Sequence, residues 1–320
     1  MRILVTGGSG YIGSHVARLL AQRGDEPVIV DDFKTGARSR VAEYAGHELA
    51  LDEPGVAQQL ASVMHEERVE AVIHFAAIKR VDESVRLPMH YLRRNLGGLA
   101  AVLEAMVIAD VGNLVVSSSA AVYGEAKGVV SEAAPTIPAS PYGQSKLAGE
   151  WLTSAMANAH GLRAVSLRYF NVAGAGWPDL ADTAALNLIP MIFERLDAGQ
   201  PPLIFGDDYD TADGTCVRDF VHVSDVAQAH LAVLDALPLQ TDAHRVFNVG
   251  VGTGSSVREV VESIRRRAPS APESVVQGRR AGDAAEVIAD VRSIAAATGW
   301  RASYSLEQII ESAWQSHKAG

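Results

Sequence analysis

The N-terminal stretch Met1–Gly13, MRILVTGGSGYIG, decides the fold of this chain. An apolar strand, Ile3–Val5, runs into a turn in which Gly7, Gly10 and Gly13 recur at every third position. Glycine permits a tight turn and lets backbone N–H groups approach a phosphate, and a helix N-terminus directly after it favours an anion. The stretch therefore predicts a turn that binds the pyrophosphate of a dinucleotide.

The residues after this turn support that interpretation. Tyr11–Arg23 has the pattern of an amphipathic helix, and it places Ile12 in its first turn, beside the expected phosphate. Val28–Val30 then reads as a second buried strand. Strand, glycine turn, helix and strand in this order form the βαβ unit that a dinucleotide site requires, so the context makes the short motif specific.

Two acids follow the second strand and indicate which dinucleotide is bound. Asp31 and Asp32 can accept hydrogen bonds from the adenosine ribose hydroxyls, whereas they would repel a 2′-phosphate. This favours NAD over NADP. NADP stays an alternative because Lys34, Arg38 and Arg40 lie close in sequence and carry the opposite charge.

Composition narrows the class of protein. The chain has 320 residues, of which 48% are hydrophobic and 21% charged, and its net charge of −10 argues against non-specific nucleic-acid binding. No apolar run approaches the roughly 18 to 20 residues of a membrane span. The only cysteine, Cys216, can form no internal disulfide, and no Cys/His spacing suggests a metal site. We expect a cytoplasmic enzyme with no metal and no nucleic-acid or membrane partner.

Apolar strand-like runs alternate with helical patterns along the first half of the chain. Such alternation predicts βαβ units and a parallel sheet covered by helices on both faces. The expected fold class is α/β, a Rossmann-type doubly wound parallel sheet with a smaller, interleaved α+β substrate domain. The strand-like runs are residues 28–31, 71–75, 114–119 and 164–168, and the helical patterns are residues 56–66, 91–109 and 142–159.

The pattern becomes irregular after Asn171, where glycine, proline and aspartate cluster. We interpret residues 1–171 as the NAD-binding domain and residues 172–320 as mainly the substrate domain. The chain is expected to return to the sheet within residues 217–250, so a single linear boundary is only approximate.

Tyr142 and Lys146 are the candidate catalytic pair. They stand four residues apart at the start of a predicted helix, which places both side chains on one face. A free phenol titrates near pH 10, and an adjacent ammonium together with an oxidised nicotinamide favours the phenolate. Ser117 to Ser119 end a predicted strand, and we assign Ser119 the role of bridging the substrate oxygen and the tyrosine.

Together these motifs resemble the extended short-chain dehydrogenase/reductase family and, within it, the UDP-glucose 4-epimerases. The resemblance covers nearly the whole chain. The matching stretches are Thr6-Gly-Gly-Ser-Gly-Tyr-Ile-Gly13, His74-Phe-Ala-Ala-Ile-Lys79, Ser117-Ser-Ser-Ala-Ala-Val-Tyr-Gly124, Leu167-Arg-Tyr-Phe-Asn171, Val217-Arg-Asp-Phe-Val-His-Val223 and Arg279-Arg-Ala-Gly-Asp283.

The resemblance implies two sets of contacts. Those to NAD come from Gly7, Gly10, Tyr11, Ile12, Gly13, Asp31, Asp32, Asp52, Phe75, Ala76, Lys79, Asn95, Ser117, Ser119, Tyr142, Lys146 and Phe170. Those to a UDP-sugar substrate come from Lys79, Ser119, Asn171, Asn187, Phe205, Arg218, Arg280, Asp283 and Val287. Some of these contacts are also plausible on physical grounds without the resemblance, because an arginine can donate two hydrogen bonds to a pyrophosphate and a phenylalanine can pack on uracil.

The resemblance also implies a reaction. Tyr142 takes the proton of the sugar 4-hydroxyl while the C4 hydride goes to NAD, and in an epimerase the keto sugar turns and takes the hydride back on its other face. A 4,6-dehydratase needs a further acid after the serine strand, where this chain has Ala120 and Ala121. Epimerisation of UDP-glucose and UDP-galactose is therefore favoured. A UDP-glucuronate or UDP-xylose 4-epimerase, and a noncatalytic NAD-sensing protein, remain alternatives.

Two positions depart from the family pattern. Arg94 precedes Asn95 where relatives often have two asparagines beside the nicotinamide half of NAD, which puts one contact in doubt. Val287 stands where several relatives carry a tyrosine that crowds the sugar's 2-substituent. The smaller side chain leads us to the hypothesis that UDP-GlcNAc is accepted as well.

The family's homodimers suggest a homodimer here. The helical patterns 91–109 and 142–159 carry apolar residues beyond one narrow stripe, and two such helices per subunit can form a four-helix interface. Packing of these residues on their own sheet competes evenly with that interpretation. The residues are Leu99, Val102, Met106, Leu147, Leu152 and Met156.

Overall fold

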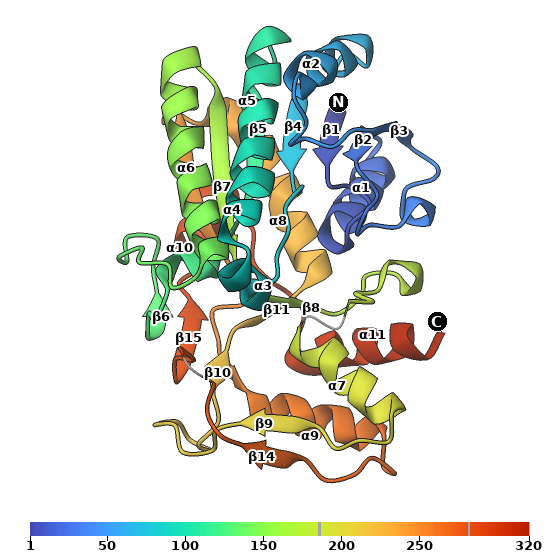
Figure 1. The fold of residues 1–320 in the computed structure, drawn as a ribbon, viewed down its shortest axis with the longest axis vertical. Coiled ribbons are helices and arrows are strands. Elements are labelled where there is room, and N and C mark those ends of the chain that lie inside the picture. The colour runs from blue at the N-terminus through green and yellow to red at the C-terminus, as the bar shows by residue number, and fades with distance from the viewer. Residues whose placement is uncertain (185–186, 281, 320) are drawn as a thin grey trace.

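The computed structural model describes residues 1–184, 187–280 and 282–319 (Figure 1). Its centre is a parallel sheet in the strand order β12-β7-β5-β4-β1-β2-β3. The order runs outward in both directions from β1 and β4, which confirms the doubly wound class and places a ligand crevice at their carboxyl ends. The strands are β1 (Arg2–Thr6), β2 (Glu26–Asp31), β3 (Ala45–Glu48), β4 (Ala71–His74), β5 (Asn113–Ser119), β7 (Arg163–Tyr169) and β12 (His244–Val249).

Helices cover both faces of this sheet. One face packs on α1 (Tyr11–Arg23), α8 (Val223–Ala236) and α10 (Arg292–Thr298), and the other packs on α2 (Val56–Glu66), α5 (Gly98–Ile108) and α6 (Pro141–His160). Fully buried side chains such as Leu20 and Leu60 each contribute about 1.5–3 kcal/mol to this packing. None of the helices in the described ranges is both long and apolar enough to cross a membrane.

The helix predicted over residues 91–109 is interrupted. After α3 (Val81–Arg86), the chain forms α4 (Pro88–Tyr91), a π-helical segment η2 (Leu92–Gly97) and then α5. A π-helical turn holds one extra residue and is frequent at functional sites. Here it leaves Asn95 buried and the side chain of Arg94 20% exposed.

A smaller region lies beyond the carboxyl ends of the sheet strands, in the lower half of Figure 1. Its own core contains Ile192, Ile204, Ile264 and Ile310. Its strands form the sets β13-β10-β15-β6, β8-β11 and β9-β14. The elements of this region are β6 (Gly128–Val130), β8 (Asn171–Ala173), α7 (Leu188–Asp197), β9 (Leu203–Phe205), β10 (Val217–Arg218), β11 (Phe220–His222), β13 (Ser255–Ser256), α9 (Val257–Arg267), β14 (Val275–Gln277), β15 (Glu286–Ala289) and α11 (Leu306–Ala319). The short helical turns of the whole chain are η1 (Arg38–Arg40), η3 (Ala120–Tyr123), η4 (Pro178–Leu180) and η5 (Leu237–Leu239).

The chain rejoins the main sheet at β12, while α8 covers one of its faces. Residues 220–222, which lie within the range of the expected return, do not join this sheet. Strand β7 ends at Tyr169, and the chain bends so that Phe170 N donates to Val249 O and Asn171 N donates to Asp219 O. Because β8 has left the sheet, β11 pairs with it in a separate two-stranded ladder.

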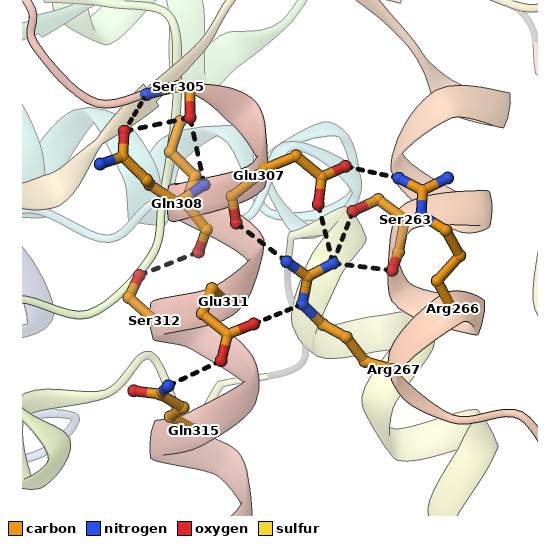
Figure 2. Close-up of polar contacts among 10 residues, drawn as sticks. Ser263, Arg266, Arg267, Ser305, Glu307, Gln308, Glu311, Ser312 and Gln315 are labelled. Carbon is orange, nitrogen blue, oxygen red and sulfur yellow. Dashed lines mark hydrogen bonds and ion pairs between the residues drawn. The ribbon is translucent and has the colours of Figure 1, made fainter.

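The C-terminal helix α11 is tied to α9 by a cluster of ion pairs (Figure 2). Arg267 contacts Glu307 at 2.9 Å and Glu311 at 2.7 Å, and Arg266 also pairs with Glu307. On another side of α11, Ser312 Oγ accepts a hydrogen bond of 3.1 Å from the backbone N–H of Ala175. The last helix therefore helps to fix the loop that follows β8.

Candidate active site

The glycine turn has no room for side chains. Gly7 has φ +68°, and a Cβ atom there would lie 2.6 Å from the backbone nitrogen of Ala76. A Cβ on Gly13 would lie 2.4 Å from Gly7 O, while Gly10 forms the N-cap of α1 and leaves Tyr11 and Ile12 in its first turn. A backbone cradle at a helix N-terminus fits the pyrophosphate of a dinucleotide.

The two acids after β2 have different surroundings. Asp31 accepts hydrogen bonds from the backbone N–H groups of Ser9 at 3.0 Å and Phe33 at 2.8 Å, one on each carboxylate oxygen. Each oxygen keeps a further lone pair for a ribose hydroxyl. Asp32 instead pairs with Arg94 at 2.6 Å and with Lys34 at 3.6 Å. The geometry therefore favours Asp31 as the ribose ligand.

The basic residues that left NADP as an alternative cofactor all contact other groups of this chain. Lys34 pairs with Asp32, Arg38 pairs with Glu48, and Arg40 donates to the carbonyl of Ala181 at 2.6 Å. A 2′-phosphate would have to break one of these contacts and would still face Asp31.

The three residues expected from the sequence to be catalytic lie at the carboxyl end of β5 (Ser119) and at the start of α6 (Tyr142 and Lys146). Burial raises the pKa of Tyr142, and the neighbouring Ser119 hydroxyl opposes that rise. Lys146 donates to Ser117 O at 2.9 Å and to Ser117 Oγ at 3.2 Å. Burial lowers the pKa of the Lys146 ammonium to about 8. A charged lysine and a bridging serine beside a buried phenol are the parts that an acid–base tyrosine needs.

A buried ion pair supports this triad, and the sequence analysis missed it. Glu150, one helical turn after Lys146 on α6, pairs bidentately with Arg168 of β7, at 2.9 Å and 2.6 Å. Both side chains are nearly inaccessible. Ser118 also donates to Glu150, at 2.5 Å, and the charge of Glu150 raises the pKa of Lys146 against the effect of burial. The spacing from Tyr142 through Lys146 to Glu150 was the available signal.

Other residues expected to contact NAD lie directly after β4, in η2 and directly after β7. The ring of Phe75 lies 4.8 Å from that of His230, and Ala76 packs at the edge of the core. The Asn95 amide donates to Ile78 O and to Ser145 Oγ and accepts from Ile78 N, so it holds the β4 loop against α6. Phe170 is 8% exposed and packs in a small cluster with Leu147.

The residues expected at the nucleotide-sugar end form two groups in the smaller region. The Arg280 guanidinium lies 3.8 Å from the centre of the Phe205 ring. Arg218 Nη2 contacts Asp283 at 3.3 Å, and Arg218 is in register with Val287 on the neighbouring strand. The structure therefore joins Phe205 to Arg280 and Arg218 to Asp283.

Asp182 connects two further residues of this set. Its carboxylate accepts from the Asn187 amide at 2.7 Å and lies 3.9 Å from Lys79 Nζ. Asp182 and Tyr11 also line a cavity of about 480 Å³ bounded by residues 172–183, α7 and α11. None of Ser119, Tyr142 and Lys146 lines it, so this cavity is separate from the catalytic groups. Asn171, the first residue of β8, is exposed.

Asp219 is a second residue that the sequence analysis did not assign to the site. Its buried carboxylate accepts from the backbone N–H groups of Val251 at 2.7 Å, Gly252 at 2.9 Å and Ala289 at 3.1 Å. Burial raises the pKa of Asp219, and these three hydrogen bonds oppose the rise. The carboxylate thus fixes the turn between Arg218 and β11 against the end of β12 and β15.

Within the described ranges, no cluster of three or more histidine, cysteine or acidic side chains could hold a metal ion.

Comparisons with known proteins show the family to which the chain belongs and the structures that it resembles. A model of the NAD dependent epimerase/dehydratase family matches residues 3–250. The chain is 42% identical over 318 residues to a UDP-glucose 4-epimerase of Azospirillum brasilense, covering 98% of this chain and 90% of that one. It superposes with a TM-score of 0.93 and 36% identity on a UDP-glucose-4-epimerase of Stenotrophomonas maltophila solved with bound NAD and formylated UDP-arabinopyranose, over 100% and 98% of the two chains. The UDP-Glc/GlcNAc 4-epimerase of Campylobacter jejuni is similar too, at 36% identity and a TM-score of 0.87 over 100% and 99%.

Proposed function

The chain belongs to the NAD dependent epimerase/dehydratase family, and from this premise we propose that it inverts C4 of a UDP-hexose, interconverting UDP-glucose and UDP-galactose. The observation that carries the proposal is the assembly of Ser119, Tyr142 and Lys146 behind a backbone cradle suited to a dinucleotide. NAD, when bound there, supplies the acceptor and then the donor of the C4 hydride.

The residues of the chain perform the proton chemistry. Tyr142 takes the proton of the sugar 4-hydroxyl and later returns it, and the hydrogen bond from Ser119 stabilises the phenolate in between. Lys146 adds a positive charge on the same helix face, one turn away, which favours the phenolate further. Hydride removal and return leave no net redox change, so the protein needs no external reductant.

The smaller region supplies the nucleotide-binding groups in this proposal. Arg218 and Arg280 hold the pyrophosphate, Phe205 packs on the uracil, and Asp283 accepts a hydroxyl. Asn171, Asn187 and Lys79 complete the set. This assignment supports the proposal that residues 1–171 bind NAD and that residues 172–320 mainly bind the substrate. The segment that contains α8 and β12 belongs with the NAD-binding part. The cytoplasmic location expected from the sequence stays a prediction.

The direct test is incubation of the purified protein with UDP-galactose and no added reductant. We expect UDP-glucose to form without accumulation of NADH. Absence of conversion, with the protein folded and NAD supplied, would contradict the proposal and direct the search to UDP-glucuronate, UDP-xylose and dTDP sugars. Release of a 4-keto-6-deoxy sugar would instead indicate a dehydratase, a class disfavoured by Ala120 and Ala121, which form the start of η3.

We propose that the same site accepts UDP-GlcNAc. Val287 lies in β15 beside Arg218 and packs against the cluster that contains Phe170. A valine leaves more space there than a tyrosine would. The similar protein of Campylobacter jejuni is named as a UDP-Glc/GlcNAc epimerase, which supports dual use.

The Val287→Tyr variant tests this specificity. We expect the ratio of kcat/KM for UDP-GlcNAc to that for UDP-glucose to fall about tenfold or more, because a clash in a packed pocket is worth ~1–3 kcal/mol of discrimination. Val287→Ala is the matched control and should leave the ratio at or above the wild-type value. No turnover of UDP-GlcNAc by a wild-type protein that turns over UDP-glucose would contradict the proposal.

We propose a homodimer, although different residues support it from those first considered. Leu99, Val102, Met106 and Leu147 are buried inside the monomer, and Leu152 and Met156 pack against the same core as the first three. These side chains therefore serve the subunit's own sheet. Other apolar side chains are exposed on α6 and on the helices α3 and α4, which contact it. There Trp151 is 66% exposed, Val85 62% and Met89 58%.

The Trp151→Glu variant tests the dimer. In light scattering at micromolar concentration, we expect the wild type at twice the subunit mass and the variant at the subunit mass, because a buried unpaired charge destabilises an apolar interface. Leu239→Glu, at an exposed leucine near the opposite face of the sheet, should remain dimeric. A subunit mass for the wild type would refute the proposal.

A further inference from the structure

Arg94 links two acids that come from separate parts of the nucleotide-binding sheet. Its Nη2 donates to Asp32 at 2.6 Å, and its Nη1 donates to Asp52 at 3.0 Å. The three side chains are only 16–25% exposed. The arginine comes from η2, Asp32 directly follows β2, and Asp52 lies in the loop between β3 and α2.

The contact lies at the adenosine end of the proposed NAD site, away from the nicotinamide half where the sequence comparison had placed this position. Asp31, which has free lone pairs for the ribose, is adjacent to Asp32 in sequence. Three carboxylates therefore belong to one end of the proposed cofactor site, and Lys34, which is 61% exposed, also pairs with Asp32 at 3.6 Å. Unscreened acids so close together would repel one another and the phosphates of the cofactor.

A guanidinium suits this position for geometric reasons. It is planar and permanently charged, and it presents donors in a fixed fork, so one side chain can hold two carboxylates at set positions. Burial opposes ionisation of Asp32, yet the hydrogen bond and charge of Arg94 hold the pKa of that carboxyl below its usual value. Arg94 therefore offsets the charge of Asp32 and holds the carboxylates of Asp32 and Asp52 in fixed positions.

We propose that Arg94 is a positioning residue for the cofactor: by clamping Asp32 and Asp52 it preforms the adenosine end of the NAD site and slows the release of NAD. The inference rests on the proposed use of NAD, and it concerns retention of the cofactor rather than chemistry at the sugar. An asparagine at this position would be too short to contact both acids as Arg94 does.

The test compares Arg94→Asn and Arg94→Lys with the wild type. NAD bound per subunit is measured after gel filtration, from the absorbance of the nucleotide released by denaturation, and the Kd of NAD is measured by titration of the stripped protein. We expect Arg94→Asn to raise that Kd about tenfold, equivalent to about 1.4 kcal/mol, and to purify with less NAD. Arg94→Lys keeps the positive charge but lacks the planar, forked donors of arginine. Its Kd for NAD should therefore lie between those of the wild type and Arg94→Asn.

Three controls separate this role from a general loss of structure. Arg93→Asn changes the neighbouring exposed arginine on η2 and should retain NAD as the wild type does. ADP-ribose, which keeps the adenosine end of NAD and lacks the nicotinamide ring, should lose affinity for Arg94→Asn as NAD does. The Kd of UDP should not change, because the smaller region binds it.

The outcomes decide the inference independently of the enzymatic activity. A Kd of NAD for Arg94→Asn within twofold of the wild type would overturn it, even if the wild type converts UDP-galactose. Equal losses of affinity for NAD and UDP would also overturn it, since they indicate a global defect. Selective loss of NAD and ADP-ribose would sustain it, even if no epimerase activity were found.

Discussion

Replacing Tyr142 by phenylalanine is expected to lower kcat for UDP-galactose by at least about 10²- to 10⁴-fold, the usual contribution of a positioned acid–base group. The variant removes only the phenolic oxygen. The ring stays between β5 and the start of α6, so the cradle for NAD and the arginines of the smaller region keep their geometry. The loss should therefore appear in kcat, while the Kd values of NAD and UDP stay close to those of the wild type.

The dependence of kcat on pH gives a second signature of the same group. Tyr142 must lose its proton to act as a base, and the Lys146 ammonium favours that loss. Because burial lowers the pKa of Lys146 to about 8, its charge disappears as the pH rises through 8. Activity is therefore expected to fall above about pH 8, because the uncharged amine no longer favours the phenolate. Lys146→Met should remove that upper limb, together with most of the activity.

Ser119→Ala serves as the milder control, because it removes the hydrogen bond that stabilises the phenolate but leaves the base in place. We expect a loss smaller than that of Tyr142→Phe. Turnover of Tyr142→Phe within tenfold of the wild type would refute the assignment of Tyr142 and move the search for the base to another residue.

Replacing Arg168 by methionine is expected to have the largest effect on stability, a loss of ~3–5 kcal/mol in the free energy of unfolding. Arg168 and Glu150 are 6% and 4% exposed, and Arg168 also donates to the hydroxyl of Tyr123 at 2.8 Å. The variant leaves Glu150 as a buried carboxylate without its counter-charge. Denaturant unfolding, followed by circular dichroism, measures the loss.

A double variant distinguishes the cost of the unpaired charge from the value of the pair. Arg168→Met combined with Glu150→Gln removes both charges, so it should recover a large part of the stability lost by Arg168→Met alone. Arg266→Ala, which breaks an exposed pair with Glu307 shown in Figure 2, should cost less than about 1 kcal/mol. A loss below about 1 kcal/mol for Arg168→Met would contradict the buried-pair interpretation.

The local sequence determined the nucleotide-binding half of the fold. The helices Tyr11–Arg23 and Val56–Glu66 were predicted with the same bounds that the structure has, because each has a continuous apolar stripe and a glycine immediately before its first turn. The strands β2, β4, β5 and β7 were recognised within two residues at each end, because each contains a run of buried apolar residues. The spacing of Tyr142 and Lys146 determined their shared face in the same local way.

Tertiary structure alone decided the contacts between residues far apart in the chain. Glu150 and Arg168 come from two different elements, and Arg94 lies 62 positions from Asp32 and 42 from Asp52. Nothing in the local pattern pairs such charges, because the energy of an ion pair depends on distance and burial in the folded state. The same holds for β11, whose partner was set by the bend after Tyr169 rather than by its own residues. The sequence by itself therefore determined the cofactor turn and the catalytic spacing, whereas the fold decided which charges hold them in place.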